Sequence, residues 1–66
     1  MKVRLKEVRQ RLHLKQKELA RKLNVSPAAI CRWEKNQRKM PAIIVYRMNT
    51  ELGVSLWELF DYGKND

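Results

Sequence analysis

Apolar residues recur three and four positions apart through much of this chain, which is the spacing of a helix with one buried face. Leu19 and Leu23 share one such face, and Ile30 and Trp33 share another. The segment between them, residues 24–26, reads Asn-Val-Ser and is followed by Pro. Asn tolerates the left-handed conformation that ends a helix, Val supplies a buried plug, and Ser-Pro is typical of a helix start. The pattern predicts a helix from about residue 16, a three-residue turn, and a second helix over 27–35.

The same spacing predicts a helix over residues 2–12, before this pair. Val3 or Leu5, Val8 and Leu12 would form its buried face, and charged residues occupy the other faces. His13 would end this helix at a positive φ angle, where His is enriched among residues other than glycine. A metal-ligand role for His13 lacks a second His or a cysteine pair, so we do not favour it.

Two further helices are expected after the pair. The β-branched run in residues 42–46 is compatible with a strand, but Ile44, Met48 and Leu52 continue one helical face as far as Gly53, a suitable C-cap. We therefore predict a helix there. Residues 55–58, Ser-Leu-Trp-Glu, form a capping box that opens a short fifth helix. The apolar residues expected to close the core from this helix are Leu56, Leu59 and Phe60.

Length and composition place these elements in one small all-α domain, a compact five-helix bundle. We expect the domain to span residues 1–61, with a helix-turn-helix core at 16–35 and a short polar tail at 62–66. The single cysteine excludes an internal disulfide, and no ligand spacing indicates a metal or cofactor. The longest uninterrupted apolar run, 42–46, is too short to span a bilayer. These features predict a soluble cytoplasmic protein that does not enter membranes.

The charge is strongly divided along the chain. Residues 1–39 hold 13 of the 15 Lys and Arg residues and three Glu, a net charge of +10, whereas residues 40–66 have a net charge of −2. Lys and Arg that neutralise phosphates release condensed counterions, which supplies most non-specific affinity for DNA. A basic surface that is merely solvated is the alternative. Because the charge coincides with the predicted helix pair, we favour a double-stranded DNA partner.

The second helix of the pair would present its outer face to DNA bases. With Ile30 and Trp33 turned inward, the exposed base-reading stripe is Pro27, Ala28, Cys31 and Arg32. Arg32 alone in this stripe can form the bidentate contact to guanine, and Ala28 can touch a thymine methyl group. We therefore expect Arg32 to supply much of the base discrimination, with a phosphate contact as its alternative role. Cys31 is interpreted as a small surface residue rather than a redox switch.

Two segments are expected to hold DNA phosphates. The first is the amino end of the helix at 16–23, where backbone N–H groups and polar side chains can bind an anion. The second is the basic loop after the helix at 27–35, in which Asn36 can adopt the left-handed conformation. Ordinary solvated residues are the alternative interpretation. The expected phosphate-binding residues are Lys15, Gln16, Lys17, Lys35, Asn36, Arg38 and Lys39.

Aromatic residues near the carboxyl end form a candidate dimer contact. Trp57 is expected to face outward or sideways, and Tyr62 lies close to it in sequence. Aromatic residues are enriched in protein interfaces, although peripheral packing is an equally open explanation.

These motifs resemble the lambda repressor and Cro-type helix-turn-helix family, the XRE class, from about Leu5 to Phe60. The segments that carry the resemblance are Arg9, Leu-Lys-Gln-Lys-Glu-Leu-Ala at 14–20, Val25-Ser26 with Ile30 and Glu34, and Leu-Gly-Val-Ser-Leu-Trp-Glu-Leu-Phe at 52–60. The chain departs from the family pattern where Lys15 replaces Thr, His13 and Asn24 replace Gly, and Cys31 replaces Ser.

The resemblance implies five helices and a homodimer on a two-fold operator. It also implies that Gln16 binds a phosphate, that positions 27, 28 and 32 read bases, and that Arg9 and Glu34 form an internal ion pair.

We therefore expect a sequence-specific DNA-binding transcriptional regulator, with a small dimeric repressor as the simplest case. The helix at 27–35 would lie in the major groove of the operator. An antitoxin-like module that uses this fold to hold a partner protein is the alternative. An enzyme is not expected, because the sequence offers no nucleophile with a base, paired carboxylates or phosphate-binding Gly loop.

Overall fold

Five helices and one pair of two-residue strands make up the computed structural model, which describes residues 2–61. In chain order the elements are β1 (Lys2–Val3), α1 (Leu5–Arg11), α2 (Gln16–Leu23), α3 (Pro27–Glu34), α4 (Ala42–Leu52), α5 (Leu56–Leu59) and β2 (Phe60–Asp61). The predicted all-α class with five helices is therefore confirmed. The strands pair antiparallel, Lys2 opposite Asp61 and Val3 opposite Phe60, and join the two ends of the described chain.

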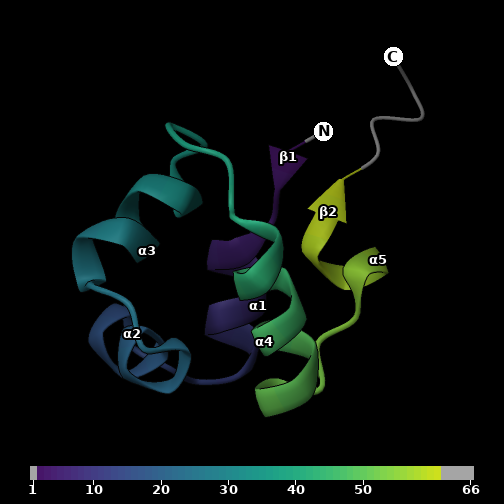
Figure 1. Cartoon of the computed structure of the whole chain (residues 1–66), viewed down its shortest axis with the longest axis horizontal. Helices are drawn as coiled ribbons and strands as arrows, with labels where there is room; N and C mark the ends of the chain where they lie inside the picture. The colour runs from purple at the N-terminus through teal and green to yellow at the C-terminus, as the bar shows by residue number, and fades with distance from the viewer. Residues whose placement is uncertain (1, 62–66) are drawn as a thin grey trace.

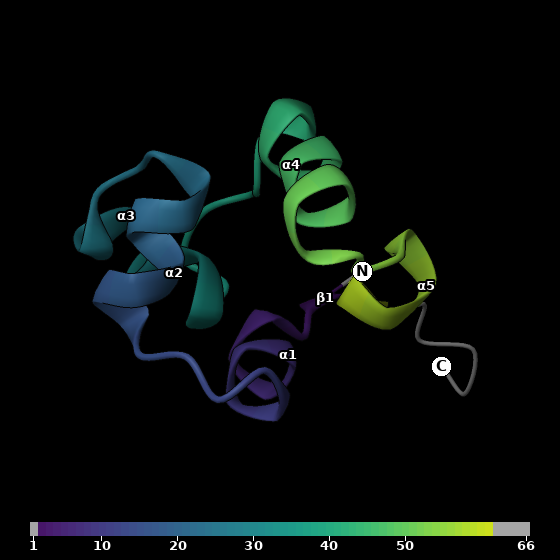
Figure 2. The same cartoon turned by 90° about the horizontal axis from the view of Figure 1, so that it is seen from below.

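The helices are arranged along one axis of the molecule, with α2 and α3 at one end and α5 with β2 at the other (Figures 1 and 2). α1 and α4 lie between these ends. α2 packs on both α3 and α4, while α1 packs on α3 and α5. Because α3 lies at one end of the molecule, its outer face points away from the other helices.

One hydrophobic core joins the helices. Every helix contributes apolar side chains to it, and no buried side-chain N or O atom in the described residues is left without a hydrogen-bond partner. Apolar burial of this kind is the main favourable term in folding. The buried residues are Leu5, Val8, Leu19, Ala20, Leu23, Ile30, Trp33, Met40, Ile44, Met48, Val54 and Leu59.

The predicted helix ends are also observed. His13, Asn24 and Asn36 have φ angles of 59°, 58° and 57°, so each takes the left-handed conformation that glycine usually supplies. Residues 42–52 form a helix rather than a strand, and Gly53 ends it at a φ angle of 68°. At α5 the Ser55 hydroxyl accepts from the Glu58 N–H, and the Glu58 carboxylate accepts from the Ser55 N–H, completing the predicted capping box.

Some predictions about the chain ends and the core were wrong. The first helix begins at Leu5 rather than residue 2, because Lys2–Val3 pairs with β2 and the Arg4 N–H donates to the Leu59 carbonyl. Leu56 is 48% exposed, and the buried residue of the one-turn helix α5 is Leu59. Phe60 belongs to β2 rather than to the fifth helix, although it packs against the core as expected, and Val25 also packs against the core but is only half-buried. The predicted tail at 62–66 lies outside the described residues.

Candidate nucleic-acid interface

The α2–turn–α3 unit is built from local backbone signals. Asn24 in the left-handed conformation turns the chain, and the Val25 N–H donates to the Ala20 carbonyl at 2.9 Å. Ser26 caps α3 by accepting from the Ala29 N–H at 3.2 Å, and Pro27 occupies the first turn. An N-cap hydroxyl satisfies a backbone donor that has no partner within the helix. A connection of three residues, 24–26, therefore fixes where α3 begins after α2.

The two faces of α3 have different environments. Ile30 and Trp33 are buried in the core, with 0% and 6% of their surfaces exposed. Pro27, Ala28 and Arg32 are exposed on the other side, and Cys31 is half-buried. Three of the four predicted base-reading residues therefore lie on the solvent face, while Cys31 lies at its margin.

Glu34 joins α3 to the two preceding helices. Its carboxylate accepts from Arg9 Nε at 2.5 Å and Arg9 Nη2 at 3.2 Å, so the expected ion pair is present. Gln16 Nε2 also donates to it at 2.9 Å, and Arg9 Nη1 donates to the Leu14 carbonyl at 2.9 Å. The Arg9 and Glu34 side chains are only 12% and 4% exposed. This network, named the Glu34 network below, holds the end of α3 against α1 and the amino end of α2.

The bond between Gln16 and Glu34 was missed by the sequence reasoning, which assigned Gln16 to a phosphate. Gln16 is half-buried and begins α2. An amide nitrogen carries two hydrogens, and the bond to Glu34 uses one of them. The other hydrogen and the backbone N–H of Gln16 remain compatible with an anion at the helix amino end.

The predicted phosphate-binding cations lie on the surface. Lys15 and Lys17 are exposed at the amino end of α2, and Lys35, Arg38 and Lys39 are exposed in the loop that follows α3. Both groups therefore flank the ends of the α2–α3 unit. Asn36 is exposed as well, but its Oδ1 accepts from the Val3 N–H at 3.0 Å.

Arg47 is a further residue that the sequence reasoning missed. Its Nη1 donates to the carbonyl of Leu23, the last residue of α2, at 2.9 Å. This bond satisfies a carbonyl at a helix end and ties α2 to α4. The sequence signal for this role is that Arg47 is the one basic residue in the segment 40–61, apart from the basic residues expected to face DNA.

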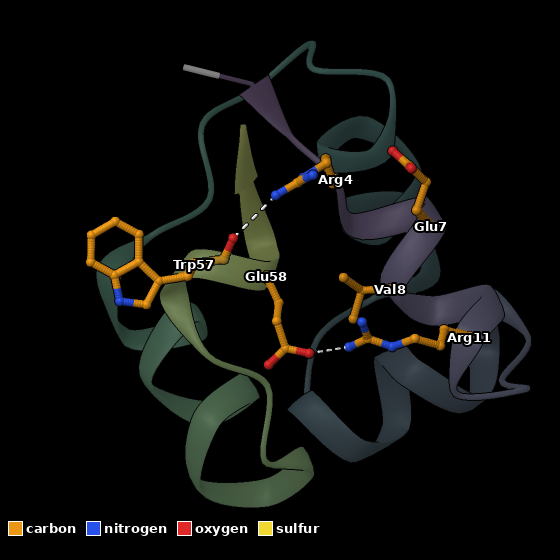
Figure 3. Close-up of a pocket in the computed structure, with 6 residues that line it drawn as sticks. All are labelled: Arg4, Glu7, Val8, Arg11, Trp57 and Glu58. Atoms are coloured by element: carbon orange, nitrogen blue, oxygen red, sulfur yellow. Dashed lines mark hydrogen bonds and ion pairs between the residues drawn. The ribbon is translucent and has the colours of Figure 1, made fainter. Parts of the chain in front are cut away.

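The candidate dimer contact lies at the other end of the molecule. Trp57 is 73% exposed, and its indole ring points away from the neighbouring side chains in Figure 3. Tyr62, its expected companion, lies outside the described residues. Trp57 borders a hollow between α1 and α5 that is also lined by Arg4, Glu7, Val8, Arg11 and Glu58.

Arg4, Arg11 and Glu58 have bonding partners in this hollow. Arg11 forms an ion pair with Glu58, and Arg4 Nη2 donates to the carbonyls of Trp57 and Phe60 at 3.1 and 3.2 Å. Hydrogen bonds from the Ser55 N–H and hydroxyl, followed by that from Arg11, lower the pKa of the Glu58 carboxyl below its usual value. The bonds from Arg4 and Arg11 hold α5 and β2 against α1, and the bonds to the Glu58 carboxyl from Ser55 and Arg11 favour its ionised form.

The described residues contain no group of three His, Cys, Asp or Glu side chains that could hold a metal ion. None of the helices in residues 2–61 has the length and apolar character needed to cross a bilayer.

Comparison with protein families gives a match over most of the chain. The model of a family described as Helix-turn-helix matches residues 5–59, which include α1 to α5. Neither the comparison with curated proteins nor the comparison with solved structures gives a match.

Proposed function

The chain belongs to the helix-turn-helix family of DNA-binding regulators, and from this premise we propose that it is a small repressor that binds its operator as a homodimer. A protein that occupies an operator can block transcription without any catalytic step. The match covers the whole of the five-helix domain, so it also argues against a catalytic function.

The observation that carries the proposal is the two-sided environment of α3. Its inner face is buried, its carboxyl end is held by the Glu34 network, and its outer face is exposed. A recognition helix needs this combination, because base contacts require a fixed helix with accessible side chains. We propose that Arg32 forms the bidentate guanine contact, and that Pro27, Ala28 and the margin residue Cys31 make close apolar contacts with neighbouring bases.

The exposed cations support phosphate contacts on both sides of α3. Lys15 and Lys17, with Gln16, would bind phosphates at the amino end of α2, and Lys35, Arg38 and Lys39 would bind phosphates along the loop. Such contacts set the position of a protein on the duplex but carry no sequence information.

A dimer would present its two α3 helices to half-sites one helical turn, about 34 Å, apart on one face of the duplex. Each domain measures 34 × 23 × 22 Å, so two copies fit on an operator of this size. We propose that Trp57, and Tyr62 with it, contribute to the contact between the copies.

The proposal is tested by titrating salt against binding to random duplex DNA and then selecting preferred sequences from a random pool. We expect the logarithm of the binding constant to fall steeply with the logarithm of the salt concentration, and an inverted repeat to be enriched. A reporter promoter that carries the repeat should lose expression when the protein is present. A steep salt slope without an enriched repeat would contradict operator binding, and an activated reporter would contradict repression.

A second function, an antitoxin-like module that holds a partner protein, is favoured by exposed apolar side chains. Ile43, Tyr46, Leu56 and Trp57 are between 48% and 73% exposed. Large exposed apolar residues often mark protein contacts. Negligible binding to duplex DNA at low salt, together with co-purification of one stoichiometric partner, would favour this function over the repressor.

A further inference from the structure

The loop between α3 and α4 is fixed at its start to the end of α3. The N–H groups of Lys35, Asn36 and Gln37 donate to the carbonyls of Cys31, Trp33 and Arg32 at 3.1, 3.1 and 2.9 Å. Asn36 has a φ angle of 57°, so the chain changes direction at this residue. The carbonyls at the end of the helix are thus satisfied, and the loop leaves α3 in one direction.

The side chain of Asn36 connects this loop to the start of the chain. Its Oδ1 accepts from the N–H of Val3, 33 residues earlier, at 3.0 Å. In the described part of the chain, this is the one hydrogen bond that joins residues 35–41 to an element other than α3 and α4. Figure 1 shows the loop passing beside β1.

β1 is itself anchored at the far end of the molecule. Val3 pairs with Phe60 in β2, and the Arg4 N–H donates to the Leu59 carbonyl at 2.7 Å. The Val3 side chain is half-buried against the core. The Val3 N–H therefore offers the loop a rigid donor, because the residues around it are held by β2 and by the core.

Beyond Asn36 the loop lies over a hollow. The hollow is lined by Val3 and Phe60 on the side of the strands and by residues 36–40 on the side of the loop. The part of the loop over the hollow ends at Met40, which is buried, whereas Arg38 and Lys39 are exposed. The placement of these two cations thus depends on the two attachment points, Asn36 and Met40, rather than on packing beneath them.

We propose that Asn36 is a positioning residue for DNA binding, which fastens the basic loop to the terminal strand pair so that Lys35, Arg38 and Lys39 meet phosphates in one arrangement. This inference rests on the proposed function. A loop ordered before binding loses less conformational entropy when its side chains contact DNA, which increases affinity.

The test is a double-mutant cycle on the two partners of this bond. Asn36→Gly removes the acceptor and keeps the positive φ angle. Val3→Pro removes the donor and keeps an apolar residue in the strand. The Val3 N–H points to Asn36, so its loss leaves the pairing with β2 intact. Val3→Ala keeps the N–H and is the matched control. Affinity for the selected operator is measured at fixed salt for both single variants, the double variant and the control.

We expect each single variant to bind about three- to tenfold more weakly, as for the loss of one hydrogen bond. The double variant should bind no more weakly than either single variant. The preferred base sequence should stay the same, while ethylation interference should weaken at the phosphates that the loop contacts. In Asn36→Gly the Val3 amide should exchange with solvent faster than in the wild type.

Additive losses in the double variant would overturn the inference, because they would mean that Asn36 contacts DNA directly. Wild-type affinity in Asn36→Gly, or losses fully explained by a larger unfolded fraction in thermal melts, would also overturn it. Failure of the proposed function is visible separately, because it appears in the wild type as negligible binding to duplex DNA or as a steep salt slope without an enriched inverted repeat.

Discussion

Arg32 is the residue on the exposed face of α3 with the greatest capacity to distinguish base pairs. Its guanidinium can donate two hydrogen bonds to guanine, while Pro27 has no side-chain donor and Ala28 offers only a methyl group. The structure places Arg32 on the solvent face, in the last turn of α3. Specificity should therefore depend on this one side chain more than on its neighbours.

Replacing Arg32 with Ala should weaken binding to the selected operator by about 1 to 3 kcal/mol and relax the preference at one base pair. Arg21, an exposed Arg in the last turn of α2, is the matched control. Arg21→Ala removes the same charge away from the base-reading face and should leave the base preference unchanged. Competition binding with single-base operator variants measures both effects. An equal loss on every sequence for Arg32→Ala would indicate a phosphate contact instead.

At the scale of the element, α3 and α5 begin with the same cap. The Ser26 and Ser55 hydroxyls each accept from the backbone N–H three residues later, at 3.2 Å in both helices. The two helices differ in their roles, because only α3 presents the proposed base-reading face. Comparing variants of Ser26 and Ser55 therefore separates the effect of a helix cap on folding stability from its effect on DNA binding.

Ser26→Ala should lower the free energy of unfolding by about 1 kcal/mol, since it leaves the Ala29 N–H without its acceptor. Ser55→Ala should lower it by a similar amount. Affinity for a single half-site should fall for Ser26→Ala, because the amino end of α3 loses its fixed direction. It should remain near the wild-type value for Ser55→Ala, because α5 is proposed to contact a second copy rather than DNA. Urea unfolding and half-site binding are measured for both. Equal losses of affinity would contradict a special role for the start of α3.

At the scale of the whole molecule, two ion pairs on α1 differ in burial. Arg9 and Glu34 are 12% and 4% exposed and belong to the Glu34 network, whereas Arg11 and Glu58 are 56% and 37% exposed. Removing one partner of a buried pair leaves a charge without compensation, while an exposed pair contributes little. The Glu34 network should therefore matter far more for the stability of the whole fold.

Arg9→Ala should lower the free energy of unfolding by about 3 to 5 kcal/mol, because Glu34 stays buried with Gln16 as its remaining partner. Arg11→Ala should lower it by about 0 to 1 kcal/mol. The free energy of unfolding of a small domain is about 5 kcal/mol, so Arg9→Ala should keep about 0 to 2 kcal/mol and melt at a much lower temperature than the wild type in circular dichroism. Similar melting curves for the two variants would contradict the proposed importance of the Glu34 network.

Local sequence signals predict the five helices, the turn between α2 and α3 and the division of charge. Periodicity, capping residues and left-handed positions such as Asn24 and Gly53 act within about four residues, so they can be identified in order along the chain. The family resemblance added the pair between Arg9 and Glu34, which lie 25 residues apart. No local pattern indicates such a pair.

The tertiary structure alone decided which distant groups meet. The bonds of Gln16 to Glu34, Arg47 to Leu23 and Asn36 to Val3 span 18, 24 and 33 residues. The strand pair at the two ends and the exposure of Leu56 likewise depend on how the helices pack. Such contacts form only when the core brings the elements together, and the periodicity of one helix contains no information about its partner.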